Sequence, residues 1–115
     1  MKTQSAKAKG RRLQQWFRNL LVESLHLDGE DLESRPMGSS GEDIIMGKQS
    51  RNVFPYSIEC KNQEKLNVWD AYEQTESNCK GYTPIVVMKK NNKKPLVVVD
   101  AEHFVTLHRN EDEII

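Results

Sequence analysis

The sequence has 115 residues, which fits a single domain with one modest hydrophobic core. Its hydrophobic fraction of 37% is ordinary for a globular chain, and no apolar run approaches the length of a membrane span. No apolar stretch follows the N-terminal lysines, so a secretory signal is not expected. We therefore predict one cytoplasmic domain over residues 1–115, flexible in residues 1–6 and 110–115, with no membrane partner.

The charges of the chain cancel in number but are unevenly distributed. The 17 lysine and arginine residues balance 17 aspartate and glutamate residues. Basic residues gather in residues 2–18 and again in residues 89–94, whereas acidic residues gather in residues 23–33 and 111–113. The two basic clusters would suit a polyanionic partner, and ordinary solvated faces are the alternative.

The first predicted element is a helix over residues 7–25. Its apolar residues recur at the three- and four-residue spacing of one buried face. They are Leu13, Trp16, Phe17, Leu20 and Leu21. The polar residues Arg11, Gln14, Gln15 and Arg18 lie away from this predicted face.

The middle of the chain predicts a loop followed by a hairpin. Residues 26–41 are rich in turn-forming residues and end in a Gly- and Ser-rich stretch. Residues 44–46 predict a short strand, residues 47–52 a turn, and residues 53–60 a second strand that pairs with the first. Pro55 indicates an irregular or edge-facing start to this second strand.

The last part of the chain predicts a helix, a second hairpin and a closing helix. Residues 66–79 have helical composition. Residues 84–88 and 95–99 are β-branched runs joined by a polar turn, and both are expected to be buried on two faces. Residues 101–108 predict the closing helix, with Asp100 as its N-cap. The order of elements predicts an α/β fold with a mixed sheet between helices.

Residues 41–61 contain the most informative pattern. Asp43 precedes the first strand of the predicted hairpin, and Glu59-Cys60-Lys61 ends the second. Because side chains alternate along a strand, Glu59 and Lys61 would share one face while Cys60 points into the opposite layer. Buried charges persist only where they pair or hold a metal ion, and two carboxylates offer the oxygen ligands that magnesium prefers. An exposed ion pair at a sheet edge is the alternative.

Asp43 together with Glu59-Cys60-Lys61 resembles the Asp…Glu-x-Lys core of the PD-(D/E)xK nuclease superfamily. The likeness is to small single-domain members, the archaeal-type Holliday junction resolvases and related phage proteins, and it covers nearly the whole chain. It implies a restriction-endonuclease-like fold with a mixed central sheet of about four strands. It also implies a metal-dependent DNA endonuclease in which Asp43, Glu59 and the Cys60 carbonyl hold Mg²⁺, for which Mn²⁺ can substitute, while Lys61 orients the attacking water.

The resemblance also concerns two glutamines. In these families a helix glutamate four residues after a glycine reaches toward the metal, and the residue at that spacing from Gly10 is Gln14. Gln14 is a poorer metal ligand, so it would touch a metal-bound water or the substrate, or simply lie exposed on its helix. Gln74 matches a catalytic glutamine that family members present beside the lysine, and a surface glutamine is the alternative.

The expected DNA contacts come from the basic clusters and from the loop before Asp43. Related resolvases carry an arginine and a Gly-Ser pair on this loop, where donors meet the DNA backbone, and Arg35, Ser39 and Ser40 match them by position. The full predicted set is Arg11, Arg12, Gln14, Arg18, Arg35, Ser39, Ser40, Lys89, Lys90 and Lys93.

The function that the resemblance implies is hydrolysis of phosphodiester bonds in branched DNA during recombination, without a nucleotide cofactor, in a prokaryotic or phage-infected cell. A four-way junction is cut on two strands related by an approximate twofold axis, so we expect a homodimer with an interface in residues 85–99 and 104–107. Two alternatives remain open. One is a phage-type nuclease for another structured or single-stranded DNA, and the other is an inactive DNA-binding module of the same fold.

Overall fold

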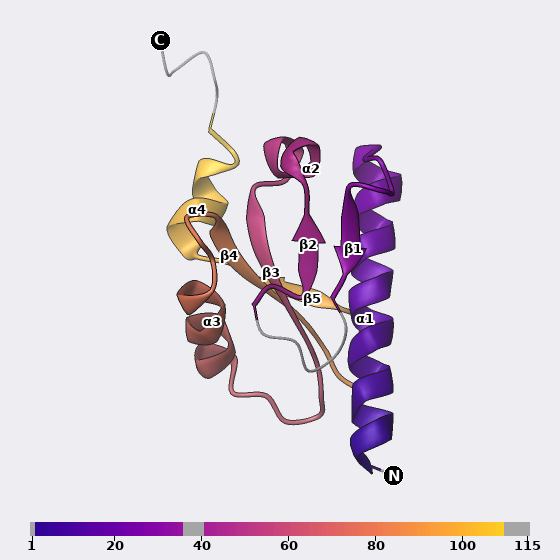
Figure 1. The fold of residues 1–115 in the computed structure, drawn as a ribbon. Coiled ribbons are helices and arrows are strands. Elements are labelled where there is room, and N and C mark those ends of the chain that lie inside the picture. Colours follow the sequence, from indigo (N-terminus) through magenta and orange to yellow (C-terminus); the bar gives the residue numbers. More distant parts are fainter. Residues whose placement is uncertain (1, 36–40, 110–115) are drawn as a thin grey trace.

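Helix α1 (Lys2–Leu25) is the longest element in the computed structural model, which describes residues 2–35 and 41–109 (Figure 1). Its inner face buries Leu13, Phe17 and Leu21, which recur every four residues and are each at most 6% exposed. The predicted helix is confirmed, although it begins at Lys2. The prediction that Gln14 lies away from the buried face is wrong, because its side chain is 3% exposed and hydrogen-bonds to Ser34.

Two short strands beside α1 form the smaller of two sheets (Figure 1). β1 (Leu32–Ser34) pairs antiparallel with β2 (Ile44–Met46), with Leu32 opposite Met46. β1 lies where the sequence predicted a loop, so that prediction is wrong. The strand has three residues and one apolar side chain, which is too little for an alternating pattern to be recognised.

The predicted pairing of residues 44–46 with residues 53–60 is also wrong. The predicted turn between them is helix α2 (Lys48–Val53), and β2 pairs with β1 instead. β2 is still linked to the next strand, because the Asp43 N–H donates to the Ile58 carbonyl oxygen at 2.9 Å.

Asp31 gives a physical reason for α2. The Gly47 N–H donates to the Asp31 carbonyl oxygen at 2.7 Å, and the Ser50 N–H donates to the Asp31 carboxylate, also at 2.7 Å. These bonds satisfy two backbone donors at the start of a helix that has no side-chain cap of its own. The turn that follows β2 therefore coils into α2 instead of reversing into a hairpin.

The larger sheet has the strand order β3-β4-β5. β3 (Tyr56–Asn62) and β4 (Thr83–Lys89) run parallel, and helix α3 (Val68–Ser77) is the crossover that parallel strands require. Asn67 caps α3 by accepting the Asp70 N–H at 3.1 Å. The predicted helix over residues 66–79 is confirmed with slightly shorter bounds.

β5 (Leu96–Val98) pairs antiparallel with β4, so the second predicted hairpin is confirmed. Helix α4 (Ala101–Thr106) follows, and Asp100 caps it by accepting the His103 N–H at 2.9 Å, as predicted. The expectation that both strands are buried on two faces is wrong for β5, where Leu96 is 49% and Val97 48% exposed. β5 is the edge of its sheet, with β4 as its neighbour.

Both sheets contribute to one hydrophobic core against α1, while α3 and α4 lie on the far side of the larger sheet (Figure 1). The buried members are Leu13, Phe17, Leu21, Leu32, Ile44, Met46, Ile58, Cys60, Ile85 and Val87. The predicted α/β class is confirmed. The described strands form two sheets, of two and three strands, and not the single sheet of about four that was expected.

Candidate active site

The candidate site lies where the smaller sheet meets the edge of the larger one. Asp43 sits directly before β2, and its carboxylate accepts the Cys60 N–H of β3 at 2.7 Å. Its own N–H donates to the Ile58 carbonyl oxygen on the same strand. These two bonds fix Asp43 beside the residue between them, Glu59.

Glu59 and Lys61 lie on one face of β3, as the alternation of side chains predicted. The Lys61 Nζ atom is 3.5 Å from Glu59 Oε2, and the Glu59 residue is 8% exposed. Burial, followed by the nearby Asp43 carboxylate, raises the pKa of Glu59 to about 7, and Lys61 opposes this shift only in part. The structure therefore brings Asp43, Glu59 and Lys61 together. When both carboxyl groups are ionised, their two negative charges exceed the one positive charge of the lysine.

The pKa of Asp43 is also raised, mainly by burial. The Cys60 N–H, the Lys61 ammonium and contacts with Glu59 and Gln14 act in the opposite direction and favour the ionised carboxylate. With both pKa values raised, the two carboxyl groups hold protons more tightly than isolated acids do. A cation bound between Asp43 and Glu59 would offset the repulsion between the two carboxylates when both are ionised.

Gln14 reaches this cluster from α1. Its Oε1 atom accepts a hydrogen bond from the Ser34 hydroxyl at 2.7 Å, and its side chain lies close enough to Asp43 to lower the pKa of that carboxyl. The position matched by resemblance is thus at the site. Ser34 was missed, because its strand was predicted to be a loop and a single serine carries no pattern.

Cys60 contributes backbone atoms to the site. Its side chain is 6% exposed within the core, and burial raises the pKa of the thiol well above its ordinary value. A thiol held neutral in this way is a poor metal ligand. The main-chain carbonyl remains the group that Cys60 would offer to a cation.

Lys61 and Gln74 line one depression of about 360 Å³ between β3 and α3. Gln74 is exposed on α3, and Asn67 and Asp70 line the same depression. The structure therefore places Gln74 and Lys61 in the same depression.

An ion pair next to Asp43 escaped the sequence analysis. Arg51 of α2 donates to Glu42 Oε1 at 2.6 Å, and both side chains are nearly buried. Arg51 also donates to the Tyr56 carbonyl oxygen at 2.9 Å and stacks over the Tyr82 ring at 4.2 Å. Its contacts connect the residue before Asp43 to the start of β3 and so support the position of the site.

The predicted DNA contacts fall into several groups. Arg11 and Arg12 are exposed on α1. Arg18 instead donates to the carbonyl oxygens of Leu32 and Gly29, and therefore holds the turn before β1. Ser39 and Ser40 lie outside the described residues.

Arg35 is the described residue of the loop that was matched to the resolvases. Its Nε atom donates to the Glu42 carbonyl oxygen at 2.7 Å, and its N–H donates to the Asp43 carbonyl oxygen at 2.7 Å. The side chain is half-buried. Arg35 thus holds the chain in place beside Asp43.

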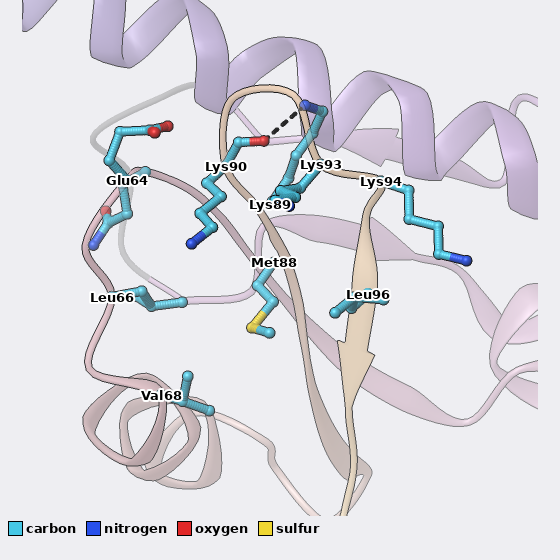
Figure 2. A pocket seen from close by; sticks show the side chains of 10 residues that line it. Glu64, Leu66, Val68, Met88, Lys89, Lys90, Lys93, Lys94 and Leu96 are labelled. Carbon is cyan, nitrogen blue, oxygen red and sulfur yellow. Dashed lines mark hydrogen bonds between the residues drawn. The ribbon is translucent and has the colours of Figure 1, made fainter.

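The lysines after β4 surround a groove of about 400 Å³ (Figure 2). Its apolar floor includes Leu66, Val68, Met88 and Leu96, and its rim carries Lys89, Lys90, Lys93 and Lys94. The turn is closed by the Lys93 N–H, which donates to the Lys90 carbonyl oxygen at 3.2 Å, and by the Asn91 N–H, which donates to Glu64 at 2.7 Å. The second basic cluster is therefore an ordered feature beside the ends of β3 and β4.

Among the side chains that the structure describes, no three His, Cys, Asp or Glu residues gather as a metal site. The acidic side chains at the candidate site are those of Asp43 and Glu59. None of the described helices is both long and apolar enough to span a membrane. Comparisons with protein-family models, with curated proteins and with solved structures found no match for this chain.

Proposed function

We propose that this protein is a magnesium-dependent endodeoxyribonuclease of the PD-(D/E)xK type that cuts branched DNA. The observation that supports this most is the convergence of Asp43, Glu59 and Lys61 at the edge of β3, with the pKa of Glu59 raised to about 7. Carboxyl groups with shifted pKa values beside a lysine are common at catalytic sites, because catalysis needs ionisable groups at buried positions that shift their pKa values.

The donor set fits a hard divalent cation. Asp43 and Glu59 bring two carboxylates against the single ammonium of Lys61, so the cluster has room for further positive charge. These two carboxylates and the Cys60 carbonyl would hold Mg²⁺, or Mn²⁺ in its place. Such an ion supplies a more acidic bound water and stabilises negative charge on a phosphate.

The other residues take roles that follow from their positions. Lys61 carries a positive charge at the mouth of the site, where it orients a water molecule and stabilises charge that develops on the scissile phosphate. Gln14, held by Ser34, fixes the Asp43 carboxylate. Gln74 lines the depression beside Lys61 and contacts the substrate there.

Two exposed basic regions would bind the DNA backbone. Arg11 and Arg12 lie on α1, Lys89 ends β4, and Lys90 and Lys93 lie on the turn between β4 and β5. Guanidinium and ammonium groups bind phosphates and release counterions, so binding through them falls as salt rises. Arg18 and Arg35 do not belong to this set because their part-buried side chains bind backbone carbonyl oxygens of distant residues. Lys89 stays in it, because the bond from its Nζ atom to the carbonyl oxygen of the next residue, Lys90, is exposed.

The arrangement of elements supports the proposed restriction-endonuclease-like fold. A helix packs on the sheet, an aspartate starts a short strand, and a Glu-x-Lys strand leads through a crossover helix into a parallel strand. The exposed apolar residues support the proposed homodimer. Leu96, Val97, Phe104 and Val105 of β5 and α4 are each at least 48% exposed, whereas residues 85–87 are buried within one chain. The interface is therefore proposed for β5 and α4.

The test is cleavage of labelled linear duplex, single strand, flap and four-way junction at equal concentrations, with magnesium, with manganese or with EDTA. We expect metal-dependent cleavage, strongest on the junction. Cleavage of the flap or the single strand alone would favour another phage-type specificity. The neutral Gln14 favours a second candidate, an inactive binding module, which would bind the junction without cutting it in either metal.

A further inference from the structure

A third cavity, distinct from the candidate active site and from the two hollows described above, lies between α1 and the ends of β3 and β4. Its volume is about 310 Å³. The residues that line it include Lys9, Arg12, Trp16, Asn62, Lys89 and Asn91. Among the described lining residues none is acidic, so three cations converge on a space large enough for part of a polyanion.

Trp16 is the unusual residue of this cavity. It belongs to the apolar series of α1, yet it is 45% exposed whereas Leu13 and Phe17 on either side are buried. Its ring lies 6.3 Å from that of Phe17 and tilted against it, so one part of the indole packs on the core and another borders the cavity. A half-exposed indole between cations is the arrangement on which proteins stack bases of single strands.

The polar groups around Trp16 match the rest of a nucleotide. Asn62 donates from its side chain to the Lys9 carbonyl oxygen at 3.0 Å, which ties the end of β3 to α1 and gives the cavity a fixed wall. Arg12 and Lys89 both line it and come from two different elements, α1 and β4. A base on Trp16 would leave its phosphates within the positive field of these side chains.

We propose that this cavity binds one unpaired nucleotide of a DNA strand, with the base stacked on Trp16 and the phosphates on Arg12, Lys9 and Lys89. The inference rests on the proposed function and narrows its substrate class. Leu13, which lines the cavity, precedes Gln14 in α1, whereas Asn62 faces α1 and its neighbour Lys61 lines the depression toward α3, so the cavity and Lys61 lie on different faces of β3. The preferred substrate therefore has an unpaired nucleotide that reaches the α1 face of β3, and intact duplex lacks it.

The chain offers a direct experiment, because it contains 2 tryptophans and Trp69 lies on α3, 78% exposed and away from this cavity. In Trp69→Phe protein the fluorescence reports Trp16 alone. We expect quenching when short oligo(dT) is added in EDTA, where no cleavage occurs. In the matched variant Trp16→Phe the fluorescence comes from Trp69 alone, and we expect no quenching. Quenching by free dTMP as strong as that by the oligonucleotide would overturn the assignment to a DNA strand.

A binding assay supplies the second measurement. Trp16→Ala should weaken binding of oligo(dT) about tenfold, and should weaken binding of blunt duplex much less. Circular dichroism of the variant checks that α1 is intact, and the Trp69→Phe titration does not depend on that variant at all. Equal affinities of Trp16→Ala and wild type, without quenching of Trp16, would overturn the inference even if magnesium-dependent cleavage is found. Quenching of Trp16 by oligo(dT), in a protein that cuts none of the four labelled DNA substrates with magnesium or manganese, would support the cavity and refute the nuclease.

Discussion

β3 and β4 of the larger sheet have seven residues each, whereas β1 and β2 of the smaller sheet have three. The larger sheet is held by apolar burial, with residues 85–87 at most 2% exposed. The smaller sheet also buries Leu32, Ile44 and Met46 in the core, but its main chain is held in addition by polar side chains, from Arg18 to Leu32 and from Arg35 to Glu42. The candidate site takes Glu59 and Lys61 from the first region and Asp43 from the second. Its geometry therefore needs both kinds of stabilisation.

The largest effect is expected from the site itself. Lys61→Ala and Glu59→Gln should each lower the rate of junction cleavage by at least about 100-fold, because they remove a charge that acts on the transition state or a metal ligand. Junction affinity in EDTA should change little. Lys65→Ala, an exposed lysine nearby, is the matched control. A Lys61→Ala variant that cuts at the wild-type rate would refute the role given to Lys61.

The apolar region should show the largest loss of stability. Ile58 of β3 is fully buried, so Ile58→Ala should lower the free energy of unfolding by about 2–5 kcal/mol through lost burial and the cavity that remains. Val53→Ala is the control, since Val53 is 55% exposed and should change stability little. Urea unfolding followed by circular dichroism measures both. Equal effects of the two variants would contradict the assignment of β3 to the core.

The polar region should lose stability by another mechanism. Arg51→Met leaves the Glu42 carboxylate nearly buried without its cation, and one Glu42 oxygen already lacks a partner in the described structure. We expect a loss of about 3 kcal/mol. The double variant Glu42→Gln/Arg51→Met should recover part of it, because it removes the uncompensated charge. Lys48→Met on the exposed side of α2 serves as control, and no recovery in the double variant would argue against a buried charge.

The same contrast explains what the sequence could predict. Glu59 and Lys61 lie on a long strand whose alternation is visible, and the position of Asp43 came from the spacing of the motif. The contacts that build the smaller sheet follow no period. Asp31 binds Ser50 and Gln14 binds Ser34 across 19 and 20 residues, and such side-chain bonds leave no pattern in the sequence. The sequence therefore did not predict β1, α2 or the role of Ser34. The crossover from β3 to β4 was compatible with the predicted order of elements.

A pH experiment sharpens the comparison at the site. The pKa of Glu59 is raised from 4.5 to about 7 in the folded protein, so its protonated form is favoured there. Its stabilising contribution is complete below pH 4.5 and is lost as the pH rises through about 7. In EDTA, wild type should lose thermal stability between about pH 4.5 and 7, the window between the two pKa values, and Glu59→Gln should lose less. Parallel curves for the two proteins would contradict the raised pKa.

The smallest effect is expected at Asp31, which supports α2 from a half-buried position. The Ser50 hydroxyl and the Ser50 N–H, the latter at 2.7 Å from the carboxylate, lower the pKa of Asp31 below its ordinary 3.8. The ionised form is thus favoured in the folded state, so its contribution is present above pH 3.8 and is lost as the pH falls through the lower folded value. Asp31→Asn should therefore be slightly less stable than wild type at pH 7, and the difference should vanish in strong acid. Glu30→Gln, an exposed neighbour, is the control. A difference that persists unchanged below pH 3 would mean that the charge of Asp31 is not its source, since a protonated carboxyl and the asparagine amide both still offer an oxygen to the Ser50 N–H.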